Sequence, residues 1–230
     1  MGERIIRFLL SGKDPASLAG PLAALDTELP EGVSLAYGMR DIRGSPAGTA
    51  HGKALGEPPI VYDAFVEFRE AGGGGFERLE AIACDAAAGI APFADLAHSS
   101  VIEGHCHILM SRPGPFMMIF ALSPPAGMSH DAFIGHWRDI HAPMVVAASR
   151  GKGSYLQLHG DPAASKRMAG RVSFGGPVFS GHAGGWLSDP AAVVHTLSLP
   201  ASLAALEDER RFIDHSRSSM GIFAFNGSRE

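Results

Sequence analysis

The chain has 230 residues, of which 46% are hydrophobic and 19% are charged, and its formal net charge is −5. This length can bury a sizeable core in one large domain or two small ones. Only 19 residues are Lys or Arg and they form no basic run, which argues against a nucleic-acid partner, because phosphate binding needs clustered positive charge.

The first half of the chain predicts four strands and two helices. Val33, Leu35, Tyr37 and Met39 alternate with smaller or polar residues, which is strand spacing. We expect strands at residues 5–10, 33–39, 60–68 and 101–109, and helices at 15–25 and 76–88. Residues 43–59 are rich in Gly, Pro, Ala and Ser and predict a loop, as do residues 72–75.

The second half predicts the same succession of elements. We expect strands at residues 116–122, 154–159, 178–186 and 222–225. The first helix should begin after Ser129, a plausible N-cap with Asp131 in the first turn. The second should begin at Asp189 and Pro190, with further helical turns over residues 203–213.

The two halves are similar to each other in the same order along the chain. The segment at Arg4 is similar to that at Phe116, 112 residues later, and the serines at Ser99 and Ser218 are 119 residues apart. Such a nearly constant offset indicates a duplicated unit. We therefore expect domains at 1–111 and 116–230, joined by a linker at 112–115.

Each unit reads strand, helix, strand, strand, helix, strand, which is the ferredoxin-like order. A sheet of this kind carries helices on one face only, so its other face needs a partner. Two such sheets in one chain bury both bare faces. The predicted fold class is α+β: a tandem duplication of a ferredoxin-like unit that forms an intrachain α+β barrel.

No segment predicts export or membrane insertion. The apolar stretch at the N-terminus is too short for a signal peptide, and the longest apolar stretches, such as 116–122, are the length of a strand. Two cysteines, Cys84 and Cys106, do not make a disulfide framework. We expect a cytoplasmic protein without a membrane partner.

The second half resembles a known family. Residues 125–129 (Pro-Ala-Gly-Met-Ser), Phe133 and residues 136–143 (His-Trp-Arg-Asp-Ile-His-Ala-Pro) resemble the first part of an EthD domain. The acidic residues 207–209, followed by Phe212, resemble the segment before the last strand of that domain. The resemblance covers about 116–225, and the first half looks like a diverged copy without these motifs.

The resemblance implies the dimeric α+β barrel superfamily. That superfamily includes polyketide cyclases, quinol-type monooxygenases, muconolactone isomerases and haem-dependent enzymes, and fungal relatives of EthD are associated with dehydration of polyketide-like alcohols. The fold alone therefore does not fix the reaction.

Three residues of the first helix in this half form the main candidate site. Phe133, Trp137 and His141 follow at intervals of four, which places them on one helical stripe. His141 could act as a general acid or base, with Trp137 and Phe133 against a flat substrate. Alternatively, the aromatic pair packs in the core and His141 only stabilises a helix end.

Further substrate-binding candidates lie outside this helix. Tyr155 and Gln157 share one face of the next strand with His159, and His182 lies in the third strand. Asp208, in the acidic segment, could orient a histidine. Alternatively, the side chains of Tyr155, Gln157 and His159 point to solvent. His182 would be a hydrogen-bonded core histidine, and Asp208 would lie on a solvated helix face.

Glu103, His105 and His107 would share one face of a strand, which is a pattern that suits iron or copper. No second ligand cluster accompanies them, so neither a metal nor any other cofactor is expected; haem binding is an alternative by analogy with the superfamily.

The leading hypothesis is an enzyme, of the lyase, cyclase or isomerase kind, that acts without a cofactor on a small apolar cyclic or aromatic oxygenated metabolite. The alternatives are a metal- or oxygen-dependent monooxygenase-like enzyme and a non-catalytic binder of a hydrophobic metabolite. A homodimer stays open.

Overall fold

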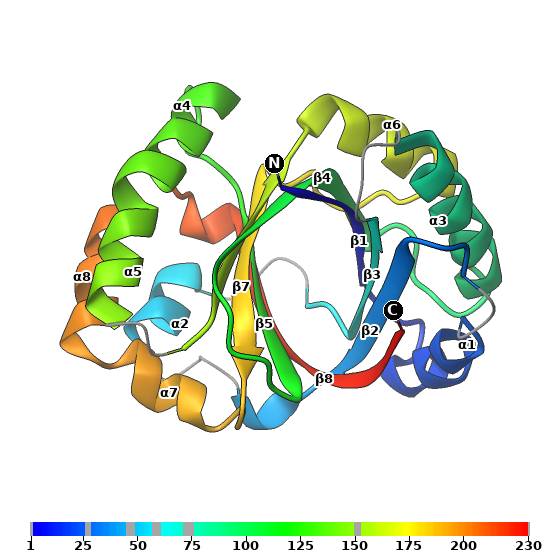
Figure 1. Cartoon of the computed structure of the whole chain (residues 1–230), viewed down its shortest axis with the longest axis horizontal. Coiled ribbons are helices and arrows are strands. Elements are labelled where there is room, and N and C mark those ends of the chain that lie inside the picture. Colours follow the sequence, from blue (N-terminus) through cyan, green and yellow to red (C-terminus); the bar gives the residue numbers. More distant parts are fainter. Residues whose placement is uncertain are drawn as a thin grey trace.

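The strands close into one antiparallel barrel in the computed structural model, which describes residues 2–25, 29–44, 49–56, 61–70, 76–149 and 153–229 (Figure 1). The eight strands are β1 (Glu3–Leu10), β2 (Val33–Arg40), β3 (Ala64–Glu70), β4 (Ser100–Met110), β5 (Phe116–Leu122), β6 (Tyr155–Gly160), β7 (Gly181–Leu187) and β8 (Ser219–Arg229).

The order of the strands confirms the duplicated ferredoxin-like unit. Around the barrel it runs β1-β3-β2-β8-β5-β7-β6-β4, and β4 pairs with β1 to close the ring. Each half therefore contributes a sheet in which its fourth, first, third and second strands lie side by side. The edges of the two sheets pair at β2 with β8 and at β4 with β6, so these edges are covered.

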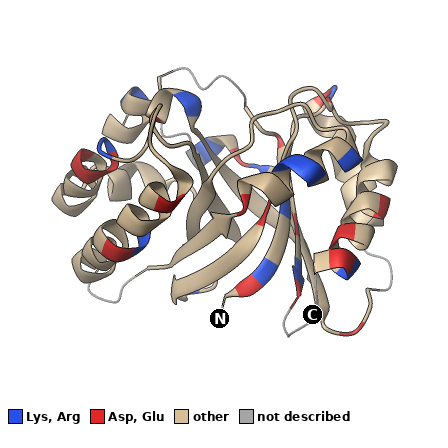
Figure 2. Cartoon of the chain, turned by 90° about the horizontal axis from the view of Figure 1, so that it is seen from above, with Lys and Arg blue, Asp and Glu red and all other residues tan. Residues whose placement is uncertain are grey.

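Helices cover the outside of the barrel in two layers (Figure 1). One layer holds the 3₁₀ turn Pro15–Leu18, α1 (Ala19–Ala24), α3 (Phe76–Ile90) and α6 (Pro162–Val172). The other holds α2 (Ala50–Leu55), α4 (His130–His136), the π turn Trp137–His141, α5 (Ala142–Ser149), α7 (Ala192–Leu197) and α8 (Pro200–Glu209). Short 3₁₀ turns at Ile42–Gly44 and His215–Arg217 complete the set. Acidic and basic residues occur in both layers (Figure 2).

The two halves exchange a helix. The connection between β2 and β3 carries α2, which packs on α8 and the His215–Arg217 turn of the second half. The connection between β6 and β7 carries α6, which packs on β4 and α3 of the first half. Each layer is therefore built from both halves of the chain.

Several sequence expectations need correction. Residues 43–59 were expected to be a loop but contain α2, whose first turn is capped by the Thr49 hydroxyl accepting from the Gly52 amide at 3.0 Å. The helix α6 was not predicted. β3 and β7 begin later than expected, at Ala64 and Gly181, and β8 is longer than expected. The expected loop at 72–75 lies outside the described residues.

The expected helix caps are largely confirmed. Ser129 caps α4, since its hydroxyl accepts from the Ala132 amide at 3.2 Å. Asp189 accepts from the Ala191 amide at 2.9 Å, and α7 itself begins at Ala192. No helix among the described residues is long and apolar enough to cross a membrane.

A buried ion pair lies inside the barrel. Arg7 is fully buried, and its guanidinium donates to the Glu67 carboxylate, with Nε at 2.7 Å from Oε2; Arg69 pairs with the same carboxylate. Burial raises the pKa of Glu67, but the charges of Arg7 and Arg69 and their hydrogen bonds outweigh it and hold the pKa at about 2. The positive charge of Arg7 inside the barrel is thus balanced by the ionised carboxylate of Glu67.

Glu67→Gln should lower the free energy of unfolding by about 3 kcal/mol, because it leaves the Arg7 charge buried without its counter-charge. Glu207→Gln, which breaks the exposed pair with Arg210, should change little. Urea denaturation of both variants checks this, and equal losses would contradict it.

In the wild-type chain, ionised Glu67 should contribute to the free energy of unfolding at pH 5 and above. This contribution should be lost as the pH falls toward 2, because protonation of the Glu67 carboxylate then breaks the pair with Arg7. Denaturation at several pH values measures this loss, which Glu67→Gln should lack.

A fragment of residues 116–230 should not exist as a folded monomer, because β6 and β8 would lose their partners β4 and β2 and expose two sheet edges. Light scattering should show self-association. A folded monomeric fragment would show that the second half does not need these edge contacts.

Candidate active site

The helix that follows β5 changes its winding where the motif residues lie. It begins as α4, passes through the π turn Trp137–His141 and continues as α5. A π turn adds a residue to one turn and is often found at functional sites. As a result the expected stripe of Phe133, Trp137 and His141 is not one continuous α-helical face.

Trp137 anchors this helix on the outer face of the sheet. Its side chain is 1% exposed, and a Cβ at position 181 would lie 2.4 Å from its ring, so Gly181 leaves the room that the indole fills. The indole N–H donates to the Tyr155 hydroxyl at 3.1 Å, and Phe133 packs on it with ring centroids 5.5 Å apart.

His141 faces α8 and pairs with Asp208, which the sequence offered only as a residue that could orient a histidine. Its Nδ1 lies 3.0 Å from Oδ2 of Asp208, and both side chains are buried. Asp208 is also 3.2 Å from Nε2 of His136. A carboxylate only accepts hydrogen bonds, so neutral His141 carries its proton on Nδ1 and keeps a lone pair on Nε2. That nitrogen is 3.9 Å from Oε1 of Glu209, too far for a hydrogen bond.

Glu209 gathers three histidines around one buried carboxylate. Nε2 of His215 lies 3.0 Å away, Nε2 of His51 lies 3.8 Å away, and His141 lies beyond it. Burial raises the pKa of Glu209, but the contacts with His215 and His51 and the nearby His141 outweigh it and hold the pKa at about 2. The carboxylate therefore stays charged. We call this group the histidine–carboxylate cluster: His51, His136, His141, Asp208, Glu209 and His215.

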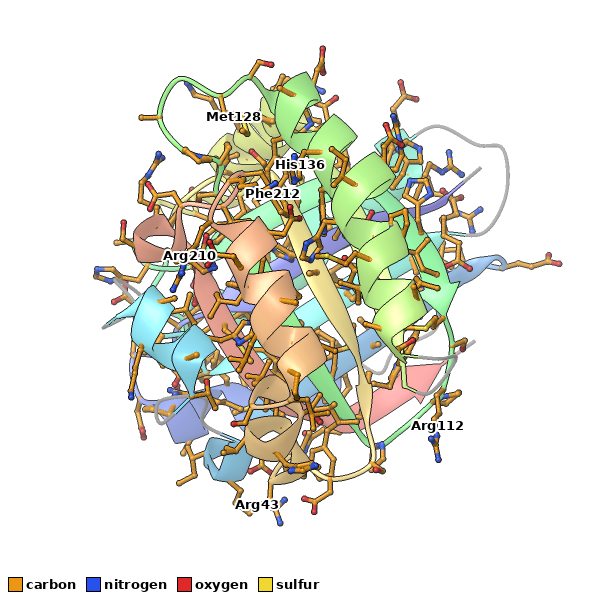
Figure 3. The ribbon with its side chains drawn as sticks, turned by 90° about the vertical axis from the view of Figure 1, so that its left-hand side faces the viewer. Arg43, Arg112, Met128, His136, Arg210 and Phe212 are labelled. Carbon is orange, nitrogen blue, oxygen red and sulfur yellow. The ribbon has the colours of Figure 1, made fainter. Side chains whose placement is uncertain are left out.

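An aromatic ring forms part of the wall of the cluster. Phe212 stacks on His136 with centroids 4.7 Å apart and lies 5.2 Å from His141. Figure 3 shows His136 and Phe212 beside each other, with α4 on one side and α8 on the other. Phe133 packs on the far side of Phe212 at 5.7 Å. The imidazoles thus meet an apolar surface as well as carboxylates.

Tyr155, Gln157 and His159 share the outer face of β6, as expected, and are linked by hydrogen bonds. The Gln157 amide nitrogen donates to the Tyr155 hydroxyl at 2.9 Å and to the Trp137 carbonyl at 3.2 Å. Its amide oxygen lies 2.8 Å from Nε2 of His159. Tyr155 and Gln157 are therefore bonded to the helix that carries His141, and their predicted contact with substrate stays a prediction.

His182 lies apart from these residues. It is 1% exposed inside the barrel, where its Nδ1 is 3.4 Å from Nη1 of Arg7 and its ring packs on Phe179. The sheet separates it from Trp137 and His141. Burial and the Arg7 charge lower the pKa of His182 well below its usual value.

Glu103, His105 and His107 lie on the outer face of β4 and line a cavity of about 960 Å³, away from the cluster. Among residues 2–25, 29–44, 49–56, 61–70, 76–149 and 153–229, no group of three His, Cys, Asp or Glu is arranged to hold a metal ion.

Sequence reasoning missed four members of the cluster: His51, His136, Glu209 and His215. His136 and Glu209 lie inside the motifs that suggested the family. Their closeness in sequence to His141 and Asp208 could therefore have identified them as candidates. His51 had none, because it comes from the half that lacks the motifs and from a segment expected to be a loop.

The comparisons with known proteins agree with this architecture. Residues 125–216 match the EthD domain family. No curated protein matches the sequence. A candidate monooxygenase from Lactobacillus acidophilus NCFM superposes with a TM-score of 0.53 and 12% identity, over 99% of this chain and 96% of that one.

Two further solved structures have the same fold. A candidate monooxygenase from Fusobacterium nucleatum has a TM-score of 0.56 at 8% identity, over 100% of this chain and 94% of that one. A candidate chlorite dismutase has a TM-score of 0.51 at 11% identity, over 99% and 96%. These likenesses extend over both halves of the chain, and the match to the EthD domain, over residues 125–216, includes most of the histidine–carboxylate cluster.

Proposed function

We propose that the chain is an enzyme that moves a proton on a small apolar, cyclic or aromatic oxygenated metabolite, without a cofactor. The reaction is a dehydration, a cyclisation or an isomerisation. The observation that carries the proposal is the buried contact of 3.0 Å between Nδ1 of His141 and Oδ2 of Asp208.

In this mechanism Asp208 orients His141 and His141 transfers the proton. The carboxylate holds the proton of the neutral ring on Nδ1, so Nε2 can take a proton from the substrate. The imidazolium that forms is stabilised by Asp208 on one side and by Glu209 on the other. The same ring then returns the proton to a departing hydroxyl group, which leaves as water in a dehydration.

The surroundings of His141 suit an apolar substrate. Its side chain is only 6% exposed, so a substrate that reaches Nε2 leaves bulk water behind. Low polarity strengthens the charge interactions of the imidazolium with the two carboxylates. Phe212, which is fully buried and packs 5.2 Å from His141, and Phe133 next to it keep the surroundings of the imidazole apolar.

The alternative is oxygen-dependent chemistry. Two of the structural relatives are candidate monooxygenases, but at 8% and 12% identity they support the shared barrel and not the reaction. A non-catalytic binder of a hydrophobic metabolite is the third possibility. The three possibilities differ in whether turnover occurs, whether it requires oxygen and whether it requires His141.

His141→Gln should lower the rate of water loss from a β-hydroxy cyclic ketone at least 100-fold, because a general acid–base group contributes about 10²–10⁴ to the rate. The assay is mass spectrometry of anaerobic incubations with a panel of such ketones. Arg210→Gln, a surface change outside the cluster, is the matched control. Turnover that needs oxygen would favour the monooxygenase, and binding without turnover would favour the binder.

Asp208→Asn should also lower turnover but leave substrate affinity nearly unchanged, because Asp208 acts through His141. The amide group of the introduced asparagine can donate a hydrogen bond to Nδ1 of His141, which moves the ring proton to Nε2. Nitrogen-15 NMR of labelled histidine reports that tautomer directly. An unchanged tautomer together with unchanged turnover would remove Asp208 from the mechanism.

A further inference from the structure

The cavity lined by Glu103, His105 and His107 lies between the two helical layers, apart from the histidine–carboxylate cluster. It has a volume of about 960 Å³, and it is lined by α3 and α6 on one side, by α4 and Arg138 on the other, and by β4 and β6 at its floor. The helices α4 and α6, which contribute to its lining, lie on either side of the N-terminus (Figure 1). Neither His141 nor Asp208 lines it.

Glu103 lies in this cavity with an oxygen that no described residue satisfies. The residue is 3% exposed, and its Oε2 is buried without a hydrogen-bond partner. Buried carboxylates are normally paired or protonated. Because Glu103 lines the cavity, a ligand bound there is a source of the missing hydrogen-bond donor.

The charges around Glu103 come from α3 and α6. Glu80 on α3 opposes its ionisation, as does Asp161 at the start of α6, while Arg167 and Arg171 on α6 favour it. Arg171 is already paired with Glu80. Burial is the largest cause and raises the pKa of Glu103 to about 7.

The rest of the lining favours a cation over an anion. Besides Glu80, Glu103 and Asp161, the cavity is lined by Glu77 and Asp131. Against these five carboxyl groups stand two guanidinium groups, and that of Arg138 is paired with Asp139. An anionic ligand would meet an excess of like charge.

Two neutral imidazoles complete the site. The rings of His107 and His159 lie 4.6 Å apart. Burial lowers the pKa of both, that of His159 to about 4, so at neutral pH they offer acceptors and ring faces but no positive charge.

The proton on His159 can be placed from its neighbours. The Trp137 carbonyl only accepts, so the Gln157 group that faces it is the amide nitrogen. The Gln157 oxygen then accepts from Nε2 of His159 at 2.8 Å. Nδ1 of His159 is left as a hydrogen-bond acceptor in the wall of the cavity.

We propose that this cavity is a second ligand site and binds a small organic cation, a protonated amine with a flat apolar body, with Glu103 as its counter-ion. An ammonium group has three donors and no acceptor, which matches an unpartnered carboxylate oxygen and a neutral imidazole acceptor. The imidazole rings and Phe76 receive the apolar body. A hard metal ion fits less well, because no group of three ligands converges among the described residues.

The test is calorimetric titration of the full chain with phenethylamine. We expect binding that is roughly tenfold tighter at pH 8 than at pH 6, because Glu103 is mostly ionised at the higher pH and mostly protonated at the lower. The neutral 2-phenylethanol and the anionic 3-phenylpropionate, with similar bodies, should bind at least tenfold more weakly than the amine at pH 8. Equal binding of the alcohol, or no binding of the amine, would overturn the proposal.

Glu103→Gln should weaken amine binding at least tenfold and remove its pH dependence. Glu207→Gln, which removes an exposed carboxylate that does not line the cavity, is the matched control and should change affinity less than threefold. If Glu103→Gln does not fold, carbon-13 NMR of labelled glutamate in the wild-type chain replaces it: the pKa of Glu103 should fall when phenethylamine is added. An unchanged titration would overturn the proposal, whatever the outcome at His141.

Discussion

The structure depends on the pairing of four sheet edges. A ferredoxin-like sheet leaves its second and fourth strands unpaired at the edges, and here β2 meets β8 and β4 meets β6, so that two open sheets become one closed barrel. Closure satisfies every edge and encloses an interior in which Arg7 must be balanced by Glu67. It also sets the two helical layers at a fixed separation, on which the cavity between them depends.

Closure has a second consequence for function, because connections from one half reach across to the other. The helix α2 carries His51 to Glu209, and α6 carries Asp161 and Arg167 to the cavity beside Glu103. The second half therefore does not form its site alone. The first half lacks the motifs but supplies an imidazole to the cluster and four residues of β4 to the cavity floor.

One helix serves three surfaces. Its Trp137 side chain packs on the sheet against Gly181, His141 turns toward α8, and His130 and Arg138 line the cavity. The π turn between Trp137 and His141 allows this, since a regular α-helix would keep residues four apart on the same face. The side chain of Gln157 links the cavity to the sheet contact of Trp137. It donates to the Trp137 carbonyl and accepts from His159, which lines the cavity.

Local sequence patterns determined the strands, the duplicated order and the caps, because alternation and capping depend on residues a few positions apart. The Ser129 cap and the shared face of Tyr155 and Gln157 could be anticipated, whereas the sequence did not identify His141 as the histidine that contacts Asp208. The short helix α2 could not be anticipated, because six residues rich in small side chains form a helix only when packing supports it. Only the tertiary structure placed His51 at Glu209 and left Glu103 without a partner, since both depend on which sheet edges meet, and that is decided by the whole barrel.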